Sequence, residues 1–187
     1  GGSTDERHIS GTAYAKKGVI FVAMNYRLGP YGFCAHPQLK EADGTCGNYG
    51  LYDQLEAIRY DLSVAQEIQQ AILPKVFPPF PQYDQFDIYA RMKAAKSVGG
   101  DFYDFFMIDE SHLGLTIADV SDKGVPAAIF MAISRTVIRA NALSQLSPAN
   151  CMRKSNELLC KESVNGMFVT AFYAILNILT GELVYCN

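Results

Sequence analysis

The sequence of 187 residues predicts an α+β fold, and three observations in its second half lead to that class. Residues 102–118 and 167–186 each contain two short apolar runs separated by a polar turn, which is the pattern of a β-hairpin. Residues 125–140 lie between them and carry a strongly apolar helical pattern with Pro126 near its start. Residues 148–162 predict a second helix, for which Ser147 is placed as the N-cap. We therefore expect antiparallel strands flanked by helices.

The first sixty residues differ in character from the rest. Residues 1–18 are polar and show no periodicity. Residues 18–24 form a continuous apolar run with β-branched side chains, which is typical of a strand buried on both faces. Residues 25–50 are rich in Gly, Pro, Asn and Asp, and this composition predicts turns and loops.

A long helix is predicted over residues 51–72, because a seam of residues recurs there at alternating steps of four and three. The members of this seam are Leu51, Leu55, Ile58, Leu62, Ala65, Gln69 and Ile72. The pattern fits an amphipathic helix packed on its own domain, a dimeric coiled coil, or two half-helices that happen to be in phase. Pro74 should end the helix, and the proline-rich residues 74–82 should be extended. Residues 86–90 should form a short strand.

Two aspartates mark the ends of the first hairpin. Folding residues 102–108 onto residues 112–118 about the polar turn between them brings Asp101 opposite Asp119. Directly opposed residues share one face of a sheet, with Cβ atoms about 4.5–5.5 Å apart. Two carboxylates at that separation repel and raise each other's pKa unless a cation lies between them. A hard divalent ion with oxygen ligands is the simplest such cation.

The composition argues against several classes of protein. The formal net charge of −3 gives no electrostatic basis for binding nucleic acid. No run approaches the roughly 20 apolar residues of a membrane span, and no basic segment leads into an apolar one as in a signal peptide. The five cysteines have no C-x-x-C spacing, which argues against a zinc site or a disulfide framework. We therefore expect a cytoplasmic protein that binds neither nucleic acid nor membrane.

Residues 61–187 contain a series of short motifs around the two aspartates. In chain order these are Ala65-Gln-Glu-Ile-Gln-Gln-Ala-Ile-Leu-Pro74, Val98-Gly-Gly-Asp-Phe-Tyr-Asp104, Ala118-Asp-Val-Ser-Asp-Lys-Gly-Val-Pro-Ala-Ala128, Asn156-Glu-Leu-Leu159, Phe168-Val-Thr170 and Thr180-Gly181. The series closely resembles the SpoIIE/RsbU-type phosphatases of the PPM (protein phosphatase 2C-like) superfamily. The resemblance implies a sandwich of two antiparallel sheets flanked by helices. It also implies removal of phosphate from phosphoserine or phosphothreonine with two manganese or magnesium ions.

By this resemblance Asp101 and Asp119 are metal ligands, with Asp119 bridging both ions and the backbone carbonyl of Val120 as a further ligand. Two metals can activate a water for in-line attack on phosphorus, so no protein nucleophile is required. Gly99 and Gly100 would let the backbone approach the site closely.

Four further residues are assigned supporting roles. Asp104 is either a metal residue or one that supports a metal ligand, or else it is a turn residue at the end of a strand. Asp122, Lys123 and Gly124 follow Asp119 and are expected to shape its loop. Asp122 is also expected to cap the helix that follows.

Residues 1–60 carry a second, unrelated pattern. Gly18-Val-Ile-Phe-Val-Ala-Met-Asn-Tyr-Arg-Leu-Gly-Pro-Tyr-Gly-Phe33 and Gly47-Asn-Tyr-Gly-Leu-Tyr-Asp-Gln-Leu-Glu-Ala-Ile-Arg59 resemble an internal part of the type-B carboxylesterases, which are α/β-hydrolases with a Ser–acid–His triad. No serine of this chain has the two glycines of G-x-S-x-G, so the triad chemistry is not predicted. Gly1-Gly2 is compatible with the tail of an oxyanion-hole glycine run. His8, His36 and His112 are interpreted as ordinary surface or loop histidines.

The predicted organisation has three parts: an esterase-like fragment without catalytic residues over 1–60, a linking helix over 51–73, and the N-terminal portion of a PPM phosphatase domain over 74–187. The sandwich should be incomplete, because the family has further strands and aspartate ligands beyond a turn like Thr180-Gly181. Weak metal binding and little turnover are therefore expected from this chain by itself.

The expected function is metal-dependent dephosphorylation of a regulatory phosphoprotein. One alternative is a carboxylesterase-type hydrolase fragment. Another is a non-catalytic fused or recombined chain that forms a homodimer through residues 51–72.

Overall fold

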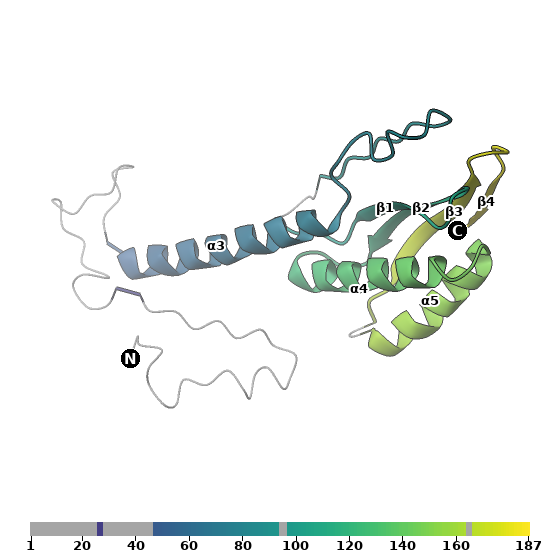
Figure 1. Cartoon of the computed structure of the whole chain (residues 1–187). Helices are drawn as coiled ribbons and strands as arrows, with labels where there is room; N and C mark the ends of the chain where they lie inside the picture. The colour runs from purple at the N-terminus through teal and green to yellow at the C-terminus, as the bar shows by residue number, and fades with distance from the viewer. Residues whose placement is uncertain (1–25, 28–46, 94–96, 164–165) are drawn as a thin grey trace. The chain divides into compact units, whose positions relative to one another are not determined.

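The structure is a computed structural model that describes residues 26–27, 47–93, 97–163 and 166–187 (Figure 1). The chain divides into two compact units, Gly1–Leu62 and Ser63–Asn187. The strand predicted at residues 18–24 lies outside the described residues, as do His8, His36 and Gly1-Gly2.

Helix α3 spans Tyr49–Ile72 and confirms the predicted long helix. It begins directly after Gly47 and Asn48, which both have positive φ angles and so cannot continue a helix backwards. It ends two residues before Pro74, whose ring cannot be placed in a helix interior. In the first unit, Asp53 of α3 forms an ion pair with Arg27 at 2.8 Å.

The second unit contains a four-stranded sheet in the order β1-β2-β3-β4, in which every neighbouring pair is antiparallel. The strands are β1 (Phe102–Met107), β2 (His112–Val120), β3 (Val169–Asn177) and β4 (Leu183–Cys186). Both predicted hairpins are therefore confirmed, and β2 and β3 form the centre of the sheet. The described part has one such sheet and three helices, in agreement with the α+β class.

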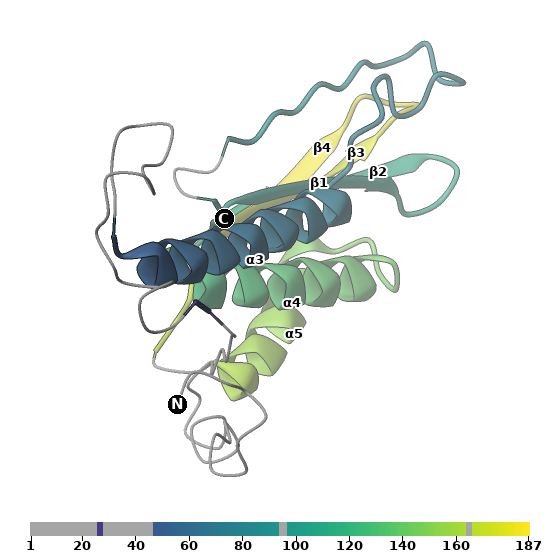
Figure 2. The ribbon, with the colours of Figure 1, turned by 90° about the vertical axis from the view of Figure 1, so that its left-hand side faces the viewer.

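Helices α4 (Val125–Ala142) and α5 (Pro148–Glu162) connect β2 to β3 and lie on one face of the sheet (Figures 1 and 2). Ser147 caps α5, because its side chain accepts a hydrogen bond from the backbone N–H of Asn150 as predicted. The predicted cap of α4 by Asp122 is wrong. The N-cap is Gly124, without a side-chain hydrogen bond, and Asp122 has a φ of 75° that turns the loop instead. Within the described residues, no helix combines the length and the apolar character needed to cross a membrane.

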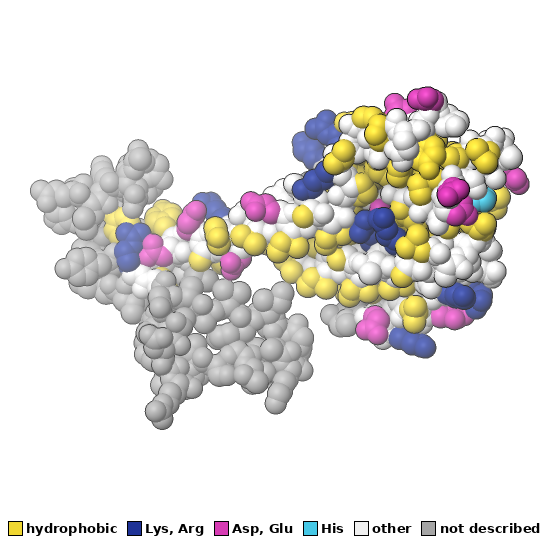
Figure 3. Space-filling model, viewed as in Figure 1, with side chains coloured by type: hydrophobic (Ala, Val, Ile, Leu, Met, Phe, Trp, Pro, Cys, Tyr) yellow, Lys and Arg dark blue, Asp and Glu magenta, His cyan; other side chains and the backbone are white. Residues whose placement is uncertain are grey.

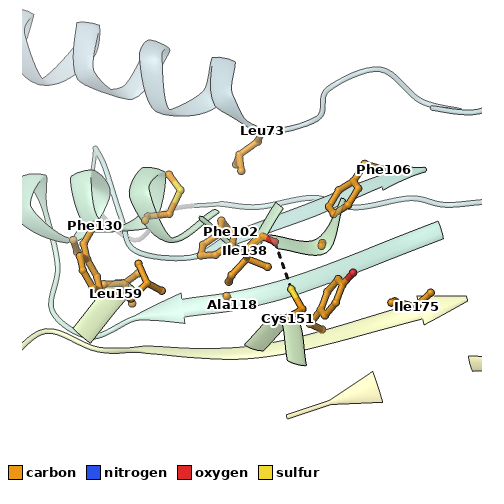
Figure 4. Close-up of a cluster of buried hydrophobic side chains, with 14 residues drawn as sticks. Leu73, Phe102, Phe106, Ala118, Phe130, Ile138, Cys151, Leu159 and Ile175 are labelled. Carbon is orange, nitrogen blue, oxygen red and sulfur yellow. Dashed lines mark hydrogen bonds between the residues drawn. The ribbon is translucent and has the colours of Figure 1, made fainter. Parts of the chain in front are cut away.

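The main hydrophobic core fills the space between this face of the sheet and the two helices (Figure 4). Along each strand, side chains that point into this core alternate with side chains that point to the other face of the sheet. Its members include Phe102, Phe106, Phe130, Met131, Ile138 and Tyr173.

The other face of β1 packs against the proline-rich segment. Phe105 contacts the rings of Phe77 and Phe80 at centroid distances of 5.7 and 6.1 Å. Phe86 contacts Phe80 and Tyr83 in turn. The strand predicted at residues 86–90 is therefore wrong, since this apolar stretch supplies side chains to an aromatic cluster and has no strand structure.

A buried ion pair interrupts the core. Asp104 of β1 is buried, and its carboxylate accepts hydrogen bonds from Arg135 at 2.9 Å and Arg139 at 3.1 Å, both on α4. The guanidinium of Arg139 also lies over the ring of Phe106, 4.6 Å from its centroid. The pair thus joins the first strand to the first helix of the second unit.

We predict that Asp104→Ala lowers the free energy of unfolding by about 3 kcal/mol, because it leaves Arg135, whose side chain is 14% exposed, without its anion, whereas the more exposed Arg139 can turn to solvent. Urea unfolding monitored by circular dichroism measures this loss. Glu157→Ala is the matched control. It removes the exposed Arg153–Glu157 pair of α5 and should cost no more than about 0.5 kcal/mol. Equal losses for the two variants would contradict the structural role of Asp104.

Candidate metal centre

Asp101 and Asp119 face each other at one end of the β1–β2 ladder. Phe102 pairs with Ala118, so the next residues outward along the two strands are Asp101 and Asp119. Phe102 and Ala118 both point into the core, and side chains alternate along a strand. The two aspartates therefore lie on the sheet face opposite α4 and α5, where both are exposed. The predicted juxtaposition of the two residues is confirmed.

The two carboxyl groups are close enough to interact. Burial raises the pKa of Asp101, and the hydrogen bond to Asp119 and the negative charge of Asp119 raise that pKa further. Among the described residues, no salt bridge to either carboxylate is present. A cation placed between the two groups would remove their repulsion.

The backbone at Gly100 lies against Val120. A Cβ atom added to Gly100 would lie 2.7 Å from the carbonyl oxygen of Val120 and 2.9 Å from its Cβ. Real Cβ atoms do not approach backbone oxygen this closely, so only glycine fits without a shift of the chain. The close approach brings the Val120 carbonyl next to the segment that carries Asp101.

The oxygen donors at this end of the ladder fit part of a site for a hard divalent ion. They are the carboxylates of Asp101 and Asp119 and the carbonyl of Val120. Mg²⁺ and similar ions prefer such oxygen ligands, and Mg²⁺ often keeps several waters while bound through one or two carboxylates. In the part of the chain that the structure describes, no cluster of three or more His, Cys, Asp or Glu side chains is placed to hold a metal.

The aspartates open into a cavity of about 620 Å³. Its walls include the exposed basic residues Arg91 and Lys93, together with Ile117. The two aspartates and the two basic residues therefore line the same cavity.

Gln69 also belongs to this region, although its place in the sequence does not predict a role at the site. Its side-chain amide donates a hydrogen bond to the carbonyl of Gly99, and its Oε1 accepts one from the Gly99 N–H at 3.1 Å. Gln69 is buried, with 5% of its surface exposed. In the sequence, this contact is indicated by a polar residue at a seam position of the helix that is otherwise apolar.

The supporting residues lie in different places. Asp104 points to the helix-covered face and is held by two arginines, so it is not brought to the aspartate pair. Asp122 and Lys123 are exposed in the loop that leads from β2 to α4. Gly124 begins that helix with a φ of 82°, which glycine adopts readily. His112 contacts Asp109 in the hairpin turn, as an ordinary turn histidine does.

The fold of the second unit matches part of a PP2C-like domain of known structure. The SiaA-PP2C domain of Pseudomonas aeruginosa superposes with a TM-score of 0.59 at 21% sequence identity, over 71% of this chain and 54% of that domain.

Family models identify the two parts of the chain. Residues 109–187 match the stage II sporulation protein E (SpoIIE) family, and residues 1–70 match the carboxylesterase family. Two separate parts of the chain are thus similar to two unrelated families, the same two that the motifs predicted.

Individual relatives agree with this division. Protein IcfG of Synechocystis is 31% identical over 156 residues, which cover 69% of this chain and 24% of IcfG. The phosphoserine phosphatase RsbU of Bacillus subtilis is 29% identical over 133 residues, which cover 71% of this chain and 38% of RsbU. The fumonisin B1 esterase of Sphingopyxis macrogoltabida is 50% identical over 62 residues, which cover 32% of this chain and 12% of the esterase. The chain thus spans well under half the length of each of these relatives.

We predict that Gly100→Ala destabilises the second unit by about 1–3 kcal/mol, because the new methyl group forces the backbone away from Val120. Thermal unfolding measures the effect. Gly114→Ala is the control and should cost less stability. Its Cβ would meet ring atoms of Phe106 at 3.1 Å, and a ring edge can shift more readily than backbone. A Gly100→Ala variant as stable as the parent would contradict the close approach.

Proposed function

We propose that the SpoIIE-type segment takes part in metal-dependent removal of phosphate from phosphoserine or phosphothreonine of a regulatory protein. The observation that carries the proposal is the opposed pair Asp101 and Asp119 at the end of the ladder, which lacks a cationic partner among the described residues. The relatedness to RsbU, a phosphoserine phosphatase, supports the reaction class.

In this proposal, Asp101, Asp119 and the carbonyl of Val120 hold manganese or magnesium, with two ions in the complete family site. When bound, such ions supply an activated water and neutralise charge that develops on the phosphoryl oxygens. The chain contributes the position of the ligands. Gly99 and Gly100 allow the close backbone approach, and Lys123 belongs to the loop that follows Asp119.

The proposed substrate is a phosphoprotein. A phosphate group carries up to two negative charges and needs cationic surroundings to approach a pair of aspartates. Arg91 and Lys93 line the same cavity as the aspartates and are exposed to solvent, so they are placed to attract it. The cavity is open enough to admit a phosphorylated side chain from another protein.

The proposed organisation keeps three parts: the esterase-like fragment over 1–60, the linking helix over 51–73 and the phosphatase portion over 74–187. No esterase activity is proposed for the first part, because no serine in the sequence has the glycines of a nucleophile elbow.

We predict that Mn²⁺ binds weakly to the chain and that Asp101→Ala and Asp119→Ala each lower its affinity more than about tenfold, which corresponds to about 1.4 kcal/mol. The loss follows from removing one of few anionic oxygen donors. Isothermal titration calorimetry measures the affinity. Asp84→Ala, which removes an exposed carboxylate just after the proline-rich segment, is the control and should bind as the parent does. Binding that is unchanged in both site variants would contradict the assignment.

We also propose that α3 forms a homodimer through its seam. The seam residues Leu51, Leu55 and Ile58 are each between 46% and 48% exposed, although they are apolar and regularly spaced. Figure 3 shows hydrophobic side chains gathered along the visible face of this helix. Pairing with a second copy of the same seam would bury them as in a two-stranded coiled coil.

We predict that the chain sediments as a concentration-dependent dimer and that Leu55→Glu shifts it to the monomer, because a charge in the seam must be desolvated on pairing. Glu67→Lys is the control, since Glu67 is exposed and lies on the side of the helix away from the seam. Sedimentation velocity at several concentrations provides the measurement. A parent chain that remains monomeric throughout would contradict the dimer.

A further inference from the structure

We propose that Gln69 is a positioning residue for the Asp101 ligand. Its buried carboxamide clamps the backbone of Gly99, two residues before Asp101, and so determines where the Asp101 carboxylate lies relative to Asp119. The link to a metal rests on the proposed function. The clamp itself is a property of the metal-free chain and is tested without any metal.

The contact uses both ends of the Gln69 amide. Its NH₂ group donates to the Gly99 carbonyl, and its Oε1 accepts from the Gly99 N–H at 3.1 Å. This reciprocal pair fixes the orientation of the amide and satisfies both polar backbone groups of one residue. The contact is partly shielded from water, because Gln69 is buried and Leu73, one turn further, is buried in the core cluster. Removing the amide would leave two backbone groups without protein partners in a partly buried place.

The segment needs such a clamp because it contains two consecutive glycines. Glycine has the greatest backbone freedom of any residue, and Gly99-Gly100 directly precede Asp101. On one side Gly100 lies against Val120, the residue after Asp119. On the other side Gly99 is held by Gln69. The glycine pair is therefore held between the strand that carries Asp119 and the last turn of α3.

The same argument explains the polar residue in the seam of α3. A leucine at position 69 would continue the apolar pattern but could make neither hydrogen bond. The neighbouring Gln70 provides a comparison, because it lies on the same helix turn and is exposed. Gln66, Gln69 and Gln70 all line one cavity of about 460 Å³ with Ser97 and Tyr103. Among the described residues, Gln69 is the member of this group that bonds to Gly99.

The first arm of the test measures amide hydrogen exchange of Gly99 by NMR in the metal-free chain. We expect Gln69→Leu to increase the exchange rate of the Gly99 amide at least about tenfold, because its acceptor is lost. Gln70→Leu is the matched control and should leave that rate unchanged. Gln69→Glu keeps an acceptor for the Gly99 N–H but loses the donor to the Gly99 carbonyl, so an intermediate rate is expected. If the Gln69→Leu variant does not fold, the Gln69→Glu variant tests the clamp in its place.

The second arm measures Mn²⁺ affinity by calorimetry together with the midpoint of urea unfolding. We expect Gln69→Leu and Gln69→Glu to weaken Mn²⁺ binding about tenfold although both carboxylates remain, which is the range seen when a group that orients a ligand is removed. A purely structural role would lower the urea midpoint and leave the affinity of the folded protein unchanged.

The outcomes separate the two proposals. Equal Gly99 exchange rates in the Gln69 and Gln70 variants would overturn the clamp. Faster exchange with unchanged Mn²⁺ affinity would overturn the positioning role. If the parent binds no Mn²⁺, or binds it independently of Asp101 and Asp119, the proposed metal centre fails. The exchange data then still decide whether Gln69 fixes the segment.

Discussion

The carboxylate of Asp104 is the constraint on which the second unit depends. It lies in the helix-covered layer, which is otherwise mostly apolar, and two arginines of α4 reach it. Arg135 and Arg139 are one helical turn apart, so a shift of α4 by one turn along the sheet would leave the carboxylate with one arginine in place of two. The ion pair therefore favours the observed register of α4. Opposite Asp104 in the ladder stand Thr116 and then Tyr173, so a polar row crosses this face at the level of the pair.

Fixing α4 also restrains the loop that precedes it, which begins directly after β2 and so lies close to Asp119 in the chain. Strand β2 is hydrogen-bonded on both sides, and Thr170 of β3 donates a hydrogen bond to the Asp119 carbonyl at 3.3 Å. Asp119 is thus positioned by the centre of the sheet. Asp101 precedes β1, which is paired on one side in the described sheet, and follows two glycines. Its position therefore depends on the side-chain contact at Gly99 and the close backbone approach at Gly100 as well as on the ladder.

This difference explains which features the sequence could predict. The opposition of Asp101 and Asp119 follows from the period of two in paired strands and from one short turn, which are local rules. The cap at Ser147 is local in the same way. The partners of Asp104 lie 31 and 35 residues away along the chain, and the Gln69–Gly99 contact spans 30 residues. No local pattern encodes such pairs. An apolar, aromatic stretch at residues 86–90 resembled a strand because strand and cluster residues have the same composition.

The seam of α3 shows why periodicity alone left several interpretations open. An apolar residue at every third or fourth position is required equally by packing on a domain and by pairing with a second helix. The seam residues differ in exposure along the helix. The exposed fraction is 48% at Leu51, near the amino end, and 5% at Gln69, near the carboxyl end. At its carboxyl end the seam packs within the second unit. There Gln69 stands at a seam position that is otherwise apolar, and its side chain forms hydrogen bonds with the Gly99 backbone. At its amino end the apolar side chains remain half-exposed. The stripe is therefore buried at one end and half-exposed at the other, and the polar break at Gln69 lies in the buried part, within the second unit.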